Sequence, residues 1–339
     1  MENIKPAAMD VLDRFDKPEV LDENERLRGF HIFWDLRNHF HEELTALDNM
    51  NLFYHYRSYE KCLARFRARD LHSGEYYFRE AQRLDRELPL SVRPGMESLF
   101  NAMVAYREYV YGRYDEAVDT LRFAIRCAEI QGETFPIFLC EIAEQWLNIV
   151  RVFVRRHDQP GIQREASLIL SFLAGGVYYD PQITARYLAL DRNTHSQALI
   201  HVIDSIHSAI VRMTKDKQEH IRSIYKGILE QLVPKLHATP VSEPVGIAFR
   251  ILSEDLQDRP ETFLQELSVH FDKIRLVPRS LQRMLWLGFL RLSDKYDIAL
   301  YEHPHYPLFV SLMNRHYKID LNSKSIRNEI PALSTVGAQ

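Results

Sequence analysis

The sequence predicts an all-α protein built from antiparallel helix pairs, and three observations support this fold class. Glycine and proline are scarce, at 12 and 15 of 339 residues, whereas strand-rich proteins need many turn residues. Leucine, alanine, glutamate and arginine, which favour helices, recur along the whole chain. Apolar residues recur at steps of three and four, which is the period of one helix face. We therefore expect an array of amphipathic helices followed by a C-terminal helical subdomain.

The composition is that of a folded protein without the features of a nucleic-acid or membrane protein. Hydrophobic residues make up 46% and charged residues 27% of the chain, as in ordinary globular proteins. The formal net charge of −4 provides no general attraction to nucleic acids. Polar residues interrupt every apolar stretch before it reaches the roughly 18 residues that a membrane-spanning helix needs. We therefore expect neither general nucleic-acid binding nor membrane insertion.

Cysteine usage and the N-terminal segment predict a cytoplasmic location. Cys62, Cys127 and Cys140 are odd in number and have no CxxC spacing, which argues against a disulfide framework and a cysteine zinc site. The segment from Met1 to Pro6 lacks the basic stretch and apolar run of a secretory signal. A reducing compartment is consistent with both features.

Three helices are predicted in the first 90 residues. Residues 1–49 form a helical segment, in which the stretch Glu23–Leu47 carries large aromatic residues on one face. A second helix is predicted over Leu52–Arg69 and a third over Ser73–Leu88, before the Pro94-Gly95 turn. Because the second and third helices are close in sequence, we expect them to form an antiparallel hairpin.

The stretch 99–129 is the most informative, because two helical patterns meet there at a short turn. Gly112 stands in the turn, Tyr114 and two acidic residues follow it, and Ala117 and Ala124 lie seven apart on the second helix. This pattern resembles the turn and second helix of the tetratricopeptide repeat (TPR). The resemblance implies a tight helix pair, in which Ala105 and the two later alanines let the backbones approach.

Weaker versions of this pattern on either side extend the resemblance over about residues 50–173. Gly74 and Ala81 upstream, and Ile162 and Ile169 downstream, take the places of the two alanines. The units are spaced further apart than the usual TPR period of about 34 residues, so they carry longer helices or connections. We therefore predict that residues 50–176 form a TPR-like α-solenoid with irregular repeats.

Residues 177–320 are predicted to form the C-terminal helical subdomain, which begins near the joint at Asp180-Pro181. Residues 321–339 are polar and have no apolar stripe, so we expect a flexible tail. Apolar stripes within the subdomain predict helices over Thr194–Met213, Lys217–Leu236, Pro244–Glu254, Pro260–Phe271 and Ser280–Asp294.

The sequence contains no recognised catalytic motif, and we predict a non-enzymatic protein without a cofactor, catalytic residues or a metal site. Phosphate-binding glycine loops, the GxSxG elbow and the HExxH zinc motif are all missing from it. His39 and His41 point roughly 200° apart on a helix, so they cannot share one ion. His303 and His305 lie among prolines and are predicted to be non-helical, but two ligands alone do not complete a site.

A binding surface is the better functional candidate. In the TPR family the first helix of each pair lines a concave groove, and the resemblance extends this role to seven residues. Tyrosine and arginine often dominate binding energy at interfaces, and arginines would suit an acidic segment or a C-terminal carboxylate. The alternative is that the tyrosines pack between helices and the arginines are solvated. The seven candidates are Tyr56, Tyr59, Arg67, Tyr106, Tyr109, Arg151 and Arg155.

Three hypotheses for function follow, in order of preference. The first is a protein–protein interaction scaffold or adaptor that binds a protein or peptide partner through this groove. The second is a regulatory protein that responds to a small ligand or peptide bound in a pocket inside the helical array, and a deep pocket with convergent polar groups would favour it. The third is an enzyme with an unrecognised helical active site. The sequence leaves the partner's identity, the pathway and the oligomeric state open.

Overall fold

Every regular element among the described residues is a helix, which confirms the all-α fold class. The computed structural model describes residues 3–15, 37, 38, 40, 42, 44–174, 178–236, 242–317, 319 and 321. The predicted helix Glu23–Leu47 lies mainly outside the described residues, and the predicted tail lies almost wholly outside them. None of the described helices is long and apolar enough to cross a membrane.

The chain folds into two compact units, and each is built from more than one stretch of sequence. The middle unit comprises residues 28–156 and 178–194, and the terminal unit comprises residues 1–27, 157–177 and 195–339. These units do not coincide with the predicted boundaries. Residues 157–176, assigned from sequence to the repeat array, belong to the terminal unit, as does the start of the N-terminal segment.

The middle unit is built from helix hairpins whose turns follow from local sequence. Thr45 and Asp48 cap the first helix reciprocally, so this helix begins six residues before its predicted start at Leu52. Gly112, with a φ of 78°, makes the tight turn of the second hairpin, where a side chain would be strained. The helices are α3 (Ala46–Arg67), α4 (Leu71–Asp85), α5 (Arg93–Val110), α6 (Tyr114–Gln131), α7 (Phe138–Arg156) and α9 (Pro181–Leu188).

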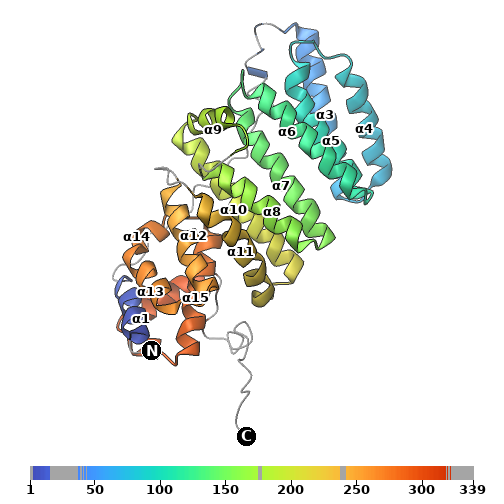
Figure 1. The fold of residues 1–339 in the computed structure, drawn as a ribbon. Coiled ribbons are helices and arrows are strands. Elements are labelled where there is room, and N and C mark those ends of the chain that lie inside the picture. The colour runs from blue at the N-terminus through green and yellow to red at the C-terminus, as the bar shows by residue number, and fades with distance from the viewer. Residues whose placement is uncertain are drawn as a thin grey trace. The chain divides into compact units, whose positions relative to one another are not determined.

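Helices α5 and α6 lie side by side along their length, as the small residues predict (Figure 1). Ala117 and Ala124 are completely buried and Ala105 is 1% exposed. The hydroxyl of Ser98 on α5 donates a hydrogen bond to the backbone oxygen of Ala124 on α6 at 3.3 Å, which requires a close crossing. In the preceding hairpin α3/α4, Gly74 lies so close to the α3 ring of Phe66 that an added Cβ would be 2.6 Å from it.

Adjacent hairpins also contact each other, because α3 packs on α5, and α7 packs on both α5 and α6. Between the first two hairpins, Cys62, Phe66, Phe78, Ala81 and Met103 form a buried cluster. Helices α3, α5 and α7 therefore form a continuous row within the middle unit.

The terminal unit packs the N-terminal helix against helices from the other end of the chain. In Figure 1 the blue α1 lies beside the orange α13, although about 250 residues separate them in sequence. Its helices are α1 (Ile4–Asp13), α8 (Gln159–Leu173), most of α10 (Arg192–Thr214), α11 (Gln218–Leu232), α12 (Glu243–Leu256), α13 (Pro260–Val269), α14 (Phe271–Ile274), α15 (Arg279–Lys295) and α16 (Tyr306–His316), with the short 3₁₀ helices η1 (Val233–Lys235) and η2 (Leu300–Glu302).

Phe15, two residues after the end of α1, anchors that helix in an aromatic cluster. The ring of Phe15 lies 4.9 Å from that of Phe271, 5.3 Å from that of Phe309 and 5.4 Å from that of Trp286, measured between centroids. Ser268 on α13 also donates a hydrogen bond to the backbone oxygen of Asp10 at 3.4 Å. The end of α1 is therefore fixed in place by contacts that the sequence analysis did not predict.

Replacing Ala124 by leucine should lower the free energy of unfolding by about 1–3 kcal/mol, because the added atoms have no space at the α5/α6 crossing. Urea denaturation followed by circular dichroism measures this loss. The control is Asp119→Leu on α6, whose side chain is 79% exposed and should tolerate the change. Equal losses in the two variants would show that the crossing is not tight.

Candidate functional site

The seven residues predicted to bind a partner lie on the row of helices α3, α5 and α7. We call them the tyrosine–arginine surface. The four tyrosines and Arg151 are partly buried, whereas Arg67 and Arg155 are exposed. By helix, the set comprises Tyr56, Tyr59 and Arg67 on α3, Tyr106 and Tyr109 on α5, and Arg151 and Arg155 on α7.

The tyrosines are arranged in two pairs of neighbouring rings. The rings of Tyr56 and Tyr59 are stacked, with centroids 6.2 Å apart, and those of Tyr106 and Tyr109 are 5.7 Å apart. The guanidinium of Arg67 lies 5.8 Å from the centre of the Tyr106 ring, so a cation–π contact joins α3 to α5. The rings are therefore packed against each other and still partly exposed, a combination of the two alternatives that the sequence left open.

Electrostatic effects connect residues on the three helices. Burial raises the pKa of Tyr109 on α5, and the positive charge of Arg155 on α7 opposes that rise most strongly. Burial also raises the pKa of Tyr59 on α3, and the next largest contribution comes from Glu141 on α7. Side chains of α3 and α7 are therefore close enough for their charges to interact with tyrosines of neighbouring helices, and the contacts link six of the seven predicted residues. Arg151 instead pairs within α7.

A polar stripe along α7 contains residues that the sequence analysis missed. Gln145 donates to the Glu141 carboxylate, and Asn148 donates to Gln145 at 3.2 Å. Arg151 donates to Asn148 at 2.6 Å and forms an ion pair with Glu144 at 3.0 Å. The positive charge of Arg151 is thus balanced within its own helix. Polar residues at steps of three and four on an otherwise apolar helix were the available signal.

Glu141 is a buried member of this stripe, with only 6% of its surface exposed. Burial raises the pKa of its carboxyl to about 7; the negative charge of Glu144 adds to the rise, and the hydrogen bond from Gln145 opposes it. A carboxyl with this pKa exchanges its proton near neutral pH, so the charge next to Tyr59 depends on pH.

A second candidate site is a cavity of about 280 Å³ in the terminal unit. Helices α11, α12 and α15 form its walls. Its apolar lining comes from Ile221, Leu252, Leu256, Met284 and Leu287, and its polar lining comes from Gln218, Glu219, Arg222, Asp255 and Arg291.

Asp255 organises the polar side of this cavity. It is 1% exposed and forms ion pairs with Arg222 on α11 and Arg291 on α15. Gly288 leaves space for its carboxyl group, because a Cβ there would lie 3.0 Å from the carboxyl carbon. The Nε of Arg291 is buried without a hydrogen-bond partner in the described part of the chain. The cavity therefore combines an apolar wall with two arginines that share one carboxylate.

Burial makes the three cysteines and His207 less reactive than the same groups in water. Burial raises the pKa of Cys62 and Cys140 to about 12 and that of Cys127 to about 11, so these thiols are poor nucleophiles at neutral pH. Burial lowers the pKa of His207 to about 4, and its Nδ1 lies 3.2 Å from the Tyr225 hydroxyl. His39 and His41 lie outside the described residues.

Comparison with protein-family models, curated proteins and solved structures finds no match for this chain. The interpretation of both sites therefore depends on the chain's own residues and their geometry.

The variant Glu141→Gln should be more stable than the wild type at high pH and equally stable at low pH. The folded-state pKa of about 7 is above the ordinary value of 4.5, so the wild type loses stability as pH rises from 4.5 through 7. The gain of the variant should reach up to about 3 kcal/mol above this range.

Urea denaturation at several pH values between 4 and 8.5 measures this difference. Asp119→Asn, which removes an exposed carboxylate on α6, corrects for the loss of one negative charge. A constant difference between the wild type and Glu141→Gln across the range would contradict the raised pKa.

Proposed function

We propose that this chain is a non-enzymatic scaffold that holds a segment of a partner protein on the tyrosine–arginine surface. The observation that carries the proposal is the position of two tyrosine pairs and several charges on one face of α3, α5 and α7. Tyrosine rings provide large contact areas at a low cost in conformational entropy, and hydroxyl groups provide directional hydrogen bonds. Such residues dominate the energy of many interfaces.

The charges on this surface indicate how a partner would be oriented. Glu141 acts on Tyr59 with Arg67 opposing it, whereas Arg155 and Arg69 act on Tyr109. The Tyr109 end of the surface is thus basic, and the Tyr59 end carries charges of both signs. A partner segment with acidic residues near Tyr109 matches this distribution.

The packing of the surface supports a scaffold that recognises its partner with little rearrangement. The tyrosines are held by their ring contacts, and Arg67 is held over Tyr106. Side chains that are ordered before binding lose less entropy on binding, which raises affinity for a given contact area. The resemblance of α5 and α6 to a TPR helix pair supports the same function, because that family displays binding residues on its first helices.

The double variant Tyr106→Ala/Tyr109→Ala should lose the partner of this protein. Pull-down from lysate of the native cells, with quantitative mass spectrometry, should show a protein captured by the wild type and depleted more than about tenfold with the variant. Tyr76→Ala provides the matched control, because this α4 tyrosine is 59% exposed and lies off the row of first helices. Partners retained by the double variant, or lost equally with Tyr76→Ala, would refute the proposed surface.

A second candidate function is ligand-dependent regulation through the Asp255 cavity. Its apolar wall and its two arginines suit a small amphipathic molecule with one anionic group, which could accept a hydrogen bond from the unpartnered Arg291 Nε. The terminal unit alone forms this cavity, so this function does not depend on the tyrosine–arginine surface.

Small amphipathic anions should raise the melting temperature of the wild type if this cavity binds them. Leu287→Trp should abolish the shift, because the larger side chain fills the cavity and leaves the Asp255 ion pairs in place. Differential scanning fluorimetry with a panel of alkyl and aryl carboxylates and phosphates measures the shift. Equal shifts in both proteins would place any binding elsewhere, and no shift with any compound would remove this candidate.

A further inference from the structure

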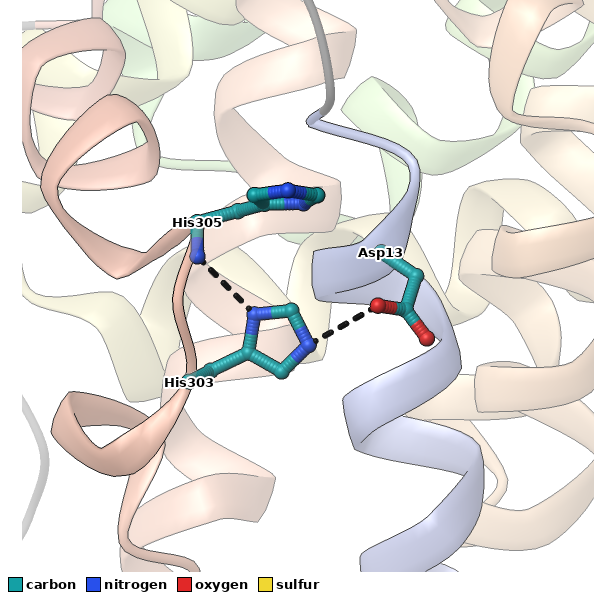
Figure 2. Close-up of side chains that lie close together, drawn as sticks. All are labelled: Asp13, His303 and His305. Carbon is teal, nitrogen blue, oxygen red and sulfur yellow. Dashed lines mark hydrogen bonds and ion pairs between the residues drawn. The ribbon is translucent and has the colours of Figure 1, made fainter.

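Three side chains suited to metal coordination meet in the terminal unit, although they come from opposite ends of the chain (Figure 2). Asp13 is the last residue of α1, and His303 and His305 lie between η2 and α16. Each offers one ligand atom, and these atoms all lie within 4.8 Å of one another. The two histidines are close in sequence, whereas the Asp13 carboxylate is brought to them only by folding.

The backbone of the loop allows both histidines to face the same point. His303 is extended, with φ −82° and ψ 136°, as expected before Pro304. His305 has φ −89° and ψ 1° and precedes the first turn of α16. The two residues are therefore not on a helix, where positions two apart would diverge. Their rings lie 5.4 Å apart between centroids.

Hydrogen bonds fix the proton positions on both rings. The Nδ1 of His305 lies 3.3 Å from the backbone oxygen of Leu12, and since this oxygen can only accept, Nδ1 carries the proton. The lone pair of His305 is therefore on Nε2. A metal-binding histidine usually donates its other ring N–H to a carbonyl or carboxylate in this way.

His303 is held between the loop and α1. Its Nδ1 accepts a hydrogen bond from the His305 backbone N–H at 3.2 Å, and its Nε2 lies 3.0 Å from the Asp13 carboxylate. Figure 2 shows both contacts as dashed lines. The separation of 3.0 Å is close to the spacing of roughly 3.3 Å between neighbouring ligand atoms around a tetrahedral zinc ion, given its bond lengths.

We propose that Asp13, His303 and His305 bind one divalent transition-metal ion of the zinc class. Two imidazole nitrogens and one carboxylate oxygen are a ligand set that such ions favour, whereas magnesium and calcium prefer sites made of oxygen atoms. The Asp13 side chain is 65% exposed and can rotate to close the remaining distance. A water molecule completes the coordination on the solvent side.

Metal binding replaces the His303–Asp13 hydrogen bond with two bonds to the ion. The ring proton of His303 moves from Nε2 to Nδ1, and the His305 N–H then loses its acceptor. The total number of protons on the neutral rings does not change.

The bound ion joins the end of α1 to the segment that leads into α16. The Phe15 cluster already packs this region from the apolar side, and the three ligands lie at its polar edge. The ion therefore acts as a clamp that stabilises the docking of the N-terminal helix. This role is independent of partner binding on the middle unit.

The test is a zinc titration of the full chain after removal of metals by a chelator. Competition with a chromogenic chelator should show that the wild type has one zinc site with a lower dissociation constant than any other. Cobalt(II) bound to the wild type should show the visible absorption bands of a site with nitrogen and oxygen ligands. Asp13→Asn and His305→Ala should each weaken this site by more than about tenfold. Zinc should also raise the melting temperature of the wild type more than that of either variant.

A matched control separates this site from weak binding to surface histidines. His270 lies 3.2 Å from Glu266 on α13, a histidine–carboxylate pair that has no third ligand among the described residues. His270→Ala should retain the wild-type zinc affinity. Asp13→Asn keeps the size and shape of an exposed side chain, so its metal-free melting temperature should match that of the wild type. Wild-type zinc affinity in Asp13→Asn, or loss of the tightest site in His270→Ala, would overturn the proposal.

Discussion

Close crossing of helices through small side chains is the constraint on which the middle unit depends. At the α5/α6 crossing, Ala105, Ala117 and Ala124 are buried, and a serine hydroxyl reaches the backbone of the opposite helix. In the hairpin α3/α4, Gly74 has the same role beneath Phe66. Two backbones that approach this closely have few alternative packings, because any side chain larger than alanine must displace a neighbour. The orientation within each pair is thereby fixed.

This constraint determines what the first helices can display. With each pair fixed, α3, α5 and α7 contact one another in sequence order, and their outer residues share a face. Tyr59 on α3 is then close enough to Glu141 on α7 for the glutamate's charge to raise the pKa of the tyrosine. The cost of this arrangement is a buried carboxyl whose ionised form is destabilised. The hydrogen bond from Gln145 offsets part of this cost.

The sequence predicted helix positions well where the apolar stripe of a helix is long. It predicted poorly which helices pack against each other. The stripe of α10 predicts its bounds to within two residues, because periodicity is a local property. The short helices α9 and α16 were missed, and α1 was predicted only as part of the helical segment 1–49, although Ile4, Ala7, Ala8 and Val11 follow a helical period. Asp13 and Asp255 could not be identified in advance, since nothing local distinguishes them from other aspartates. Their roles arise from residues 290 and 36 positions away, and only folding specifies those neighbours.

The two polar clusters of the terminal unit illustrate different uses of a carboxylate. Asp255 is 1% exposed and is neutralised by two arginines, because an unpaired charge at that depth would be prohibitively costly. Asp13 is 65% exposed and needs no such compensation. Its single contact to His303 adds little stability by itself, as expected for a pair near solvent. Its proximity to two imidazoles therefore has a stronger explanation in coordination than in salt bridging, since a divalent ion attracts all three ligands at once. Exposure, which weakens the ion pair, is also what would let the metal enter.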